Sequence, residues 1–150
     1  MPADIKVNVF LVSRSMKALQ QSAYEPIKKD TGLTQMELQI IFSIKQSPIA
    51  VTVGAIHRQT GFNKGQISVC VGNLYEKGYL TKVENSKNQF DAFVLSQKGD
   101  SIAERIEKNT SLGRKKLLAG FTQEEADKFK EFLERLQKNA KEFEGKVDFE

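Results

Sequence analysis

The sequence has little of the chemistry on which catalytic and metal sites depend. Among its 150 residues there is one cysteine, one histidine and no tryptophan. A single imidazole and a single thiol cannot supply the ligand sets of zinc sites. Gly-rich phosphate loops, the G-x-S-x-G pattern and HExxH are absent as well. The carboxylates fall in helical charge runs, which are typical of solvated faces. We therefore expect no enzyme, no metal site and no cofactor.

Long hydrophobic runs are also missing. No uninterrupted apolar run exceeds four residues, whereas a membrane-spanning helix needs roughly 18 or more. The first residues, Met1 to Asp4, lack the basic and apolar regions of a secretory signal. Cys70 alone cannot form an intrachain disulfide. These observations predict a cytoplasmic protein without a membrane partner, and its length is that of one ordinary domain.

Positive charge is concentrated in the middle of the chain. The net charge is +4 with a pI near 9.1. Residues 51–98 contain six basic and three acidic residues, whereas residues 99–150 contain eleven basic and twelve acidic ones. The middle segment is therefore the one compatible with a polyanionic partner.

Apolar periodicity and capping residues predict helices in the first third of the chain. Residues 5–24 have apolar side chains at alternating spacings of three and four, which predicts a helix that ends at Pro26. Thr34 and Glu37 have the spacing of a capping box, which predicts a second helix that continues to Pro48.

Two shorter helices follow with clear start and stop signals. Thr52 is placed to cap a helix through Thr60 that closes at Gly61. Asn63, with Gln66 three residues later, opens a helix that closes at Gly78. Its predicted buried positions are Ile67, Cys70, Val71 and Leu74. Two helices joined by a tight turn are a helix-turn-helix candidate.

The hydrophobic period then changes from 3.6 to 2. Residues 79–83 and 90–95 read as the two strands of a hairpin, joined by the polar segment 84–89. Ser96 caps a further helix that runs to about Leu118. Thr122 and Glu125 form another capping box, which opens a last helix. One apolar face of this helix is formed by Phe129, Phe132, Leu133, Leu136, Ala140 and Phe143.

This order of elements is that of a winged helix-turn-helix flanked by extra helices. In that order the sequence resembles the multiple-antibiotic-resistance regulator (MarR) family over roughly residues 5–145. The most specific stretch is Leu74-Tyr75-Glu76-Lys77-Gly78-Tyr79-Leu80. The resemblance also rests on Leu33-Thr34 through Leu38, Val51-Thr52-Val53, Gly61-Phe62-Asn63-Lys64, Ile67-Ser68 and Leu95-Ser96-Gln97-Lys98-Gly99.

The resemblance implies a mainly α fold with a small β-hairpin wing, in a single domain over residues 1–150. Approximately residues 34–98 would form the winged helix-turn-helix, and residues 5–30 and 99–145 the dimerisation helices. It implies a homodimeric transcriptional regulator, a repressor of a pseudo-palindromic operator in double-stranded DNA. Family members commonly release DNA on binding a small-molecule effector or on cysteine oxidation.

The expected DNA contacts lie on the third and fourth helices and in the wing. Gln66 is expected to hydrogen-bond adenine and Val69 to meet a thymine methyl group, or else Gln66 only caps its helix and Val69 packs against a neighbour. Lys64, Ser68 and Asn73 are expected at phosphates. The full predicted set is Thr52, Arg58, Asn63, Lys64, Gln66, Ser68, Val69, Asn73, Lys82, Lys87 and Gln89.

The sequence departs from the family pattern at these contacts. Val69 stands where relatives often have an arginine, and Lys87-Asn88-Gln89 replaces the Asp-x-Arg of the wing. The departures favour an alternative function, a winged-helix protein-interaction module or antirepressor that has lost DNA binding. Gly65 and Gly72 each cost a helix roughly 1 kcal/mol relative to alanine. They either allow close approach to DNA or leave the helix soft.

A ligand site is expected by analogy alone, with Arg14, Tyr24 and His57 as its polar contacts. Phe10, Met16 and Phe42 are candidates for its apolar lining, although each also fits an ordinary core. His57 is expected to fill a gap between helices rather than bind metal. Cys70 shares the register of buried residues, so we expect an inert core thiol rather than a redox site.

Overall fold

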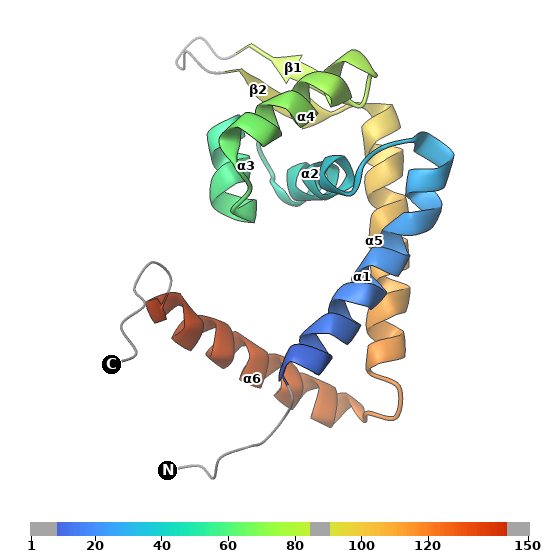
Figure 1. Ribbon diagram of the computed structural model, residues 1–150, viewed down its shortest axis with the longest axis vertical. Helices are drawn as coiled ribbons and strands as arrows, with labels where there is room; N and C mark the ends of the chain where they lie inside the picture. The colour runs from blue at the N-terminus through green and yellow to red at the C-terminus, as the bar shows by residue number, and fades with distance from the viewer. Residues whose placement is uncertain (1–8, 85–90, 144–150) are drawn as a thin grey trace. The chain divides into compact units, whose positions relative to one another are not determined.

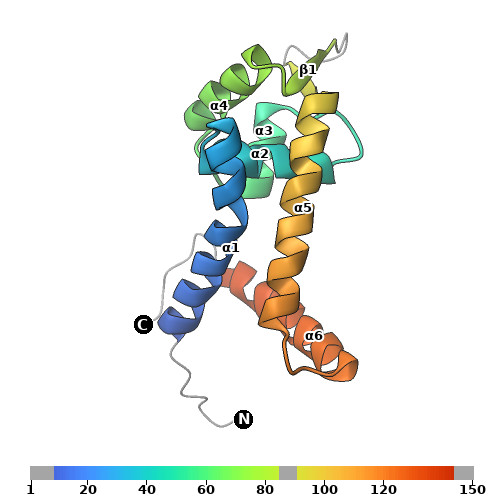
Figure 2. The same cartoon turned by 90° about the vertical axis from the view of Figure 1, so that its right-hand side faces the viewer.

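The computed structural model describes residues 9–84 and 91–143. The chain divides into two compact units, Met1–Gly113 and Arg114–Glu150. The elements are drawn in Figures 1 and 2. In chain order they are α1 (Val9–Thr31), α2 (Gln35–Gln46), α3 (Val53–Thr60), α4 (Lys64–Glu76), β1 (Leu80–Val83), β2 (Ala92–Leu95), α5 (Gln97–Leu117), α6 (Gln123–Ala140) and the 3-10 turn η1 (Lys141–Phe143).

The first helix does not end at Pro26, as the sequence predicted, but runs through it to Thr31. Proline removes one backbone donor from a helix and strains the preceding turn. Tyr24 and Ile27, on either side of Pro26, are both buried in the core. Their burial requires the helix to continue, and it offsets the cost of the proline. The helix ends instead at Gly32, whose φ of 70° is left-handed.

Thr34 is the N-cap of α2 as predicted, but the capping box is incomplete. The Glu37 backbone N–H donates to Thr34 Oγ1 at 3.2 Å. The Glu37 carboxylate accepts from the Thr34 hydroxyl at 3.1 Å instead of from the N-cap backbone. Glu37 is only 4% exposed, and its Oε2 has no hydrogen-bond partner within the described ranges. The predicted box at Thr122 is confirmed, because Thr122 and Glu125 satisfy each other's backbone N–H groups.

The helix-turn-helix forms with the predicted boundaries. Thr52 Oγ1 accepts from the Ala55 N–H at 3.1 Å and caps α3. Gly61, in the left-handed conformation, donates its N–H to the His57 carbonyl at 2.8 Å and ends α3. Asn63 Oδ1 then accepts from the N–H groups of the second and third residues of α4. The angle between α3 and α4 is therefore held by caps encoded in the sequence.

The hairpin is shorter than predicted. It pairs β1 with β2 in antiparallel register, with Leu80 opposite Leu95 and Lys82 opposite Phe93. Tyr79 is left out of the first strand because its N–H donates to the Leu74 carbonyl and closes α4. The second strand begins at Ala92 rather than at Phe90, which lies outside the described residues. Most of the predicted connecting loop also lies outside them.

A backbone bridge that the sequence did not predict joins the hairpin to the segment ahead of α3. Val51 and Phe93 exchange two antiparallel hydrogen bonds, with N···O distances of 2.9 and 2.8 Å. Both side chains are buried. Because Thr52 follows Val51 directly, the bridge places the start of α3 beside the second strand.

One hydrophobic core occupies the first unit. It takes side chains from α1 to α5 and from both strands. The largest fully buried side chains are all aliphatic: Ile27, Leu33, Leu38, Ile40, Ile41, Ile56, Ile67, Leu74 and Ile106. Polar contacts between α1 and α5 add to it, since Asn109 Nδ2 donates to the Ala23 carbonyl at 2.9 Å and Arg105 pairs with Asp30 at 2.8 Å.

The start of α5 is packed tightly against the turn that follows α4. Ser96 Oγ accepts from the Gly99 N–H at 3.1 Å and donates to the Gly78 carbonyl at 2.6 Å, which confirms the predicted cap. A Cβ atom on Gly99 would lie 2.1 Å from the Tyr79 carbonyl oxygen. A glycine is therefore required at this contact, whereas a Cβ atom on Gly72 of α4 would meet nothing within 4 Å.

We expect opposite effects from alanine at these two helical glycines. Gly99→Ala should lower the free energy of unfolding by about 1–3 kcal/mol, because the new methyl group overlaps backbone. Gly72→Ala should raise it by about 0.5–1 kcal/mol, because alanine is the better helix former and the space is open. Urea unfolding followed by circular dichroism, at one fixed protein concentration, measures both. Equal effects of the two substitutions would contradict this account of the packing.

Candidate nucleic-acid interface

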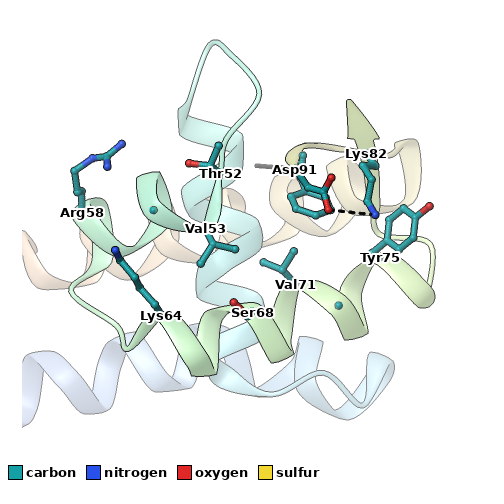
Figure 3. A pocket seen from close by; sticks show the side chains of 12 residues that line it. Thr52, Val53, Arg58, Lys64, Ser68, Val71, Tyr75, Lys82 and Asp91 are labelled. Atoms are coloured by element: carbon teal, nitrogen blue, oxygen red, sulfur yellow. Dashed lines mark ion pairs between the residues drawn. The ribbon is translucent and has the colours of Figure 1, made fainter. Parts of the chain in front are cut away.

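A groove of about 680 Å³ lies between α3, α4 and the hairpin. We call it the α4 groove. Figure 3 shows side chains from all three elements converging on it. Its lining consists of Thr52, Val53, Gly54, Arg58, Lys64, Ser68, Val71, Gly72, Tyr75, Lys82, Asp91 and Phe93. Three cations and one carboxylate make its net charge positive.

One end of the α4 groove carries two cations, and two hydroxyl groups lie toward its middle. Arg58 projects from α3 and Lys64 begins α4, and the hydroxyls are those of Thr52 and Ser68 (Figure 3). A Cβ atom on Gly54 would lie 3.6 Å from Arg58 Nη1, so the guanidinium extends along α3 toward its N-terminus. Neither Arg58 nor Lys64 has an ion-pair partner among residues 9–84 and 91–143.

The other end of the α4 groove is formed by the hairpin and the last turns of α4. Lys82 Nζ pairs with Asp91 Oδ2 at 3.5 Å and lies 4.9 Å from the centroid of the Tyr75 ring. The Tyr75 ring meets Phe93 edge-on, with 6.3 Å between centroids. Among the described residues, this end therefore carries two aromatic rings and one ion pair without net charge.

The outer face of α4 is exposed, and its inner face is buried. Ile67, Val71 and Leu74 are buried as predicted, while Cys70 is half-buried. Val69 is 65% exposed, so most of its side chain faces solvent. Gln66 and Asn73 are exposed beside it. This face presents one aliphatic and two amide side chains to solvent.

The structure divides the predicted contact residues into four groups. Five of them line the α4 groove: Thr52, Arg58, Lys64, Ser68 and Lys82. Gln66, Val69 and Asn73 lie on the outer face of α4, and Asn63 serves as its N-cap. Lys87 and Gln89 lie outside the described residues.

Several groove residues were missed from sequence. Asp91, Tyr75, Gly72 and Phe93 line it alongside the predicted cations. The hairpin register would have revealed Asp91, because it stands two residues before Phe93, the partner of Lys82. Side chains at such diagonal positions share one face of a two-stranded sheet. For Tyr75 no signal in the sequence pointed to the groove.

The two interior glycines of α4 have different environments. A Cβ atom on Gly65 would lie 3.0 Å from Asn63 Oδ1, so a larger residue there would press on the N-cap. Gly72 has open space beside it and lines the α4 groove. The contact with the N-cap explains why a glycine stands at position 65. No contact within the described ranges requires a glycine at position 72.

The expected ligand contacts do not converge on either of two hollows in the first unit. Arg14 and Tyr24 are ten residues apart on α1, which is roughly 15 Å along a helix. Tyr24 is buried, and burial raises the pKa of its hydroxyl. His57 is held at the turn, where its Nδ1 lies 2.6 Å from the Phe62 carbonyl oxygen. Because a carbonyl oxygen only accepts, His57 Nδ1 carries the proton in this contact.

Phe42 does line a second hollow of about 600 Å³ between α2 and α5, with Lys45, Gln46, Glu104, Glu107, Lys108 and Ser111. Its lining is of mixed charge. Arg14, Tyr24 and His57 line neither this hollow nor the α4 groove.

The thiol of Cys70 is in an unreactive environment. Burial raises its pKa, and the nearby Glu37 carboxylate raises it further, so less thiolate is present at neutral pH. Within the described part of the chain, no three His, Cys, Asp or Glu side chains are grouped to hold a metal ion. In that same part, every helix is too short or too polar to cross a membrane.

No protein-family model matches the chain, and no curated protein matches it in sequence. Solved structures share its fold. The transcriptional regulator SlyA superposes with a TM-score of 0.79 at 16% identity, over 95% of this chain and 100% of SlyA. A MarR-family regulator from Listeria monocytogenes, solved with a 26mer DNA, gives 0.79 at 16% identity, over 97% and 99% of the two chains.

A MarR/EmrR-family regulator from an Acinetobacter species gives a TM-score of 0.71 at 21% identity, over 89% of this chain and 94% of that one. Identities this low establish the fold rather than the activity. The similarity extends over nearly the whole length of each chain, including the helices that flank the helix-turn-helix and its wing. The chain therefore has the winged helix-turn-helix fold of the MarR-family transcriptional regulators.

Proposed function

We propose that this protein is a MarR-family transcriptional regulator that binds double-stranded DNA as a homodimer and represses from a pseudo-palindromic operator. The observation that carries the proposal is the cationic end of the α4 groove. Arg58 and Lys64 stand there without ion-pair partners within the described ranges, beside an exposed recognition-like helix. Phosphate contacts of this kind supply most of the affinity for DNA.

In the proposed complex α4 enters the major groove of DNA. Arg58 and Lys64 would hold backbone phosphates, with Thr52 and Ser68 donating hydroxyl hydrogen bonds. Asn73 would contact a further phosphate. Gln66 would face a base edge, and an amide is the side chain that pairs with adenine through two hydrogen bonds. Val69 would contact a thymine methyl group, which its exposure favours. Lys87 and Gln89 of the wing remain part of this proposal.

The proposed dimer is supported by the apolar face of α6. Phe129, Phe132, Leu133 and Leu136 are all exposed, and no described residue of α6 is buried. Exposed apolar stripes of this size mark interaction surfaces in soluble proteins. A second copy of the chain would cover the stripe and bring two winged modules to half-sites about 34 Å apart.

Release of DNA by a small ligand is a further part of the proposal. The expected polar contacts Arg14, Tyr24 and His57 would have to act through a site that the second copy completes.

A winged-helix interaction module is the alternative, and two observations favour it. Lys82 in the hairpin is already neutralised by Asp91. The exposed centre of α4 is the aliphatic Val69, where an arginine would be expected of a DNA reader. Such a module would bind another protein through the outer face of α4.

The test of the proposed function is selection of bound duplexes from random DNA by the purified protein, with its mass measured in parallel. We expect an enriched palindrome and a mass twice that of the chain. A clean dimer with no enrichment at low salt would favour the interaction module.

In the same selection Gln66→Ala should change the enriched motif, because the substitution removes the amide that would pair with a base. An unchanged motif would show that Gln66 does not read a base.

Lys64→Ala should weaken binding to all duplexes about equally, because a phosphate contact carries no sequence information. The slope of log affinity against log salt should become shallower by roughly 0.9 for each phosphate contact removed. Fluorescence anisotropy over a salt series measures both quantities. Lys29→Ala is the matched control, since Lys29 is exposed on α1 and does not line the α4 groove. Equal losses in the two variants would point to net charge alone.

Leu136→Glu should convert the dimer to a monomer, because it places a charge in the centre of the apolar stripe of α6. Sedimentation or light scattering gives the mass, and circular dichroism checks that the helices persist. Lys138→Glu, on the opposite face of the same helix, should leave the mass unchanged. If Leu136→Glu stays dimeric at micromolar concentration, α6 is not the dimer interface.

A further inference from the structure

The two ends of the α4 groove differ in the availability of their positive charge. Arg58 and Lys64 at one end have no ion-pair partner in the described part of the chain, whereas Lys82 at the other end faces Asp91 at 3.5 Å. Figure 3 shows this pair at the hairpin end, away from Arg58 and Lys64. Among the described residues that line the groove, Asp91 has the only acidic side chain.

The hairpin itself holds Lys82 and Asp91 together. Lys82 pairs directly with Phe93 across the strands, and Asp91 precedes Phe93 by two residues. Side chains at i and j−2 of an antiparallel pair project from the same face and lie within reach of a long side chain. The ammonium group is further held by the Tyr75 ring at 4.9 Å, and Tyr75 rests edge-on against Phe93. The pair is thus a consequence of strand register rather than of chance contact at the surface.

We propose that Asp91 masks Lys82 and competes with a DNA phosphate for it. This inference rests on the proposed function and assigns a role to a residue that the sequence did not single out. The α3 end of the groove anchors the DNA backbone, while the hairpin end adds little net attraction as long as Asp91 is paired. Asp91 is therefore a determinant of affinity and salt dependence that acts against binding.

The size of the effect follows from the exposure of the pair. The Lys82 and Asp91 side chains are 42% and 66% exposed, and exposed ion pairs are weak because water screens them. Freeing Lys82 should therefore tighten binding by about two- to fivefold for each groove engaged. A dimer that engages two grooves would show about the square of that factor.

A double-mutant cycle tests the proposal with the duplex obtained by selection. Asp91→Asn should tighten binding by the factor above and steepen the salt slope by about 0.9 for each groove, as one more phosphate is neutralised. Lys82→Gln alone should change the affinity by less than about twofold, because the charge it removes is already compensated. In the Asp91→Asn background the same substitution should abolish the gain.

Glu84→Gln is the matched control. Glu84 is an exposed carboxylate just after β1 that does not line the α4 groove, so its removal changes the net charge by the same amount. We expect a smaller gain from it, and one that does not depend on Lys82. Unfolding midpoints of all variants, measured alongside, should stay close together because the substituted side chains are exposed.

Two outcomes separate this inference from the proposed function. If the unsubstituted protein binds DNA and Asp91→Asn binds equally well or more weakly, Asp91 positions Lys82 rather than masking it, and the inference is wrong. The same holds if Lys82→Gln is equally damaging with and without Asp91. If no variant binds any duplex even at low salt while all remain folded, the proposed function fails and the inference fails with it.

Discussion

The pair of backbone hydrogen bonds between Val51 and Phe93 is the contact on which the candidate interface depends. It joins the segment before α3 to the second strand of the hairpin, 42 positions further along the chain. Both side chains are buried, so the two hydrogen bonds are shielded from water. The hairpin also packs on the helices through Leu80 and Phe93 in the core, and the bridge adds a directional backbone link between the start of α3 and the second strand.

The positive charge of the α4 groove depends more on where charged side chains are placed than on the net charge of the chain. The net charge of the whole chain is only +4. The fold neutralises one groove cation by pairing Lys82 with Asp91. Arg58 and Lys64 have no such partner in the described ranges. The cations at the two ends of the groove therefore differ in whether they are free of an ion pair and so able to bind a phosphate. For a protein that finds sites on DNA by electrostatics, this distribution matters more than the total.

The two units of the chain differ in how far their apolar side chains are buried. In the first unit each helix from α1 to α5 contributes side chains to one buried core. In α6 the apolar side chains are exposed, although its N-terminal capping box is complete and its polar face carries ion pairs between successive turns. A helix with well-formed local interactions and no buried face is stable only when something covers that face. The second copy proposed here would supply that cover.

The sequence by itself determined the order of the elements, because its signals act over one or two turns of chain. Thr52, Asn63 and Thr122 cap their helices as predicted, and Gly61 and Gly78 adopt the left-handed conformation that ends a helix. Such interactions are complete within four residues, so they can be read from spacing alone.

The tertiary structure decided what depends on partners far along the chain. Burial of Tyr24 and Ile27 carries α1 through Pro26, where local propensity predicted a stop. Glu37 binds the Thr34 hydroxyl instead of completing a capping box. The Lys82–Asp91 pair exists only once the strands are in register. Periodicity reports which residues face inward but carries no information on register or on which distant groups meet, and only the packed core settles those.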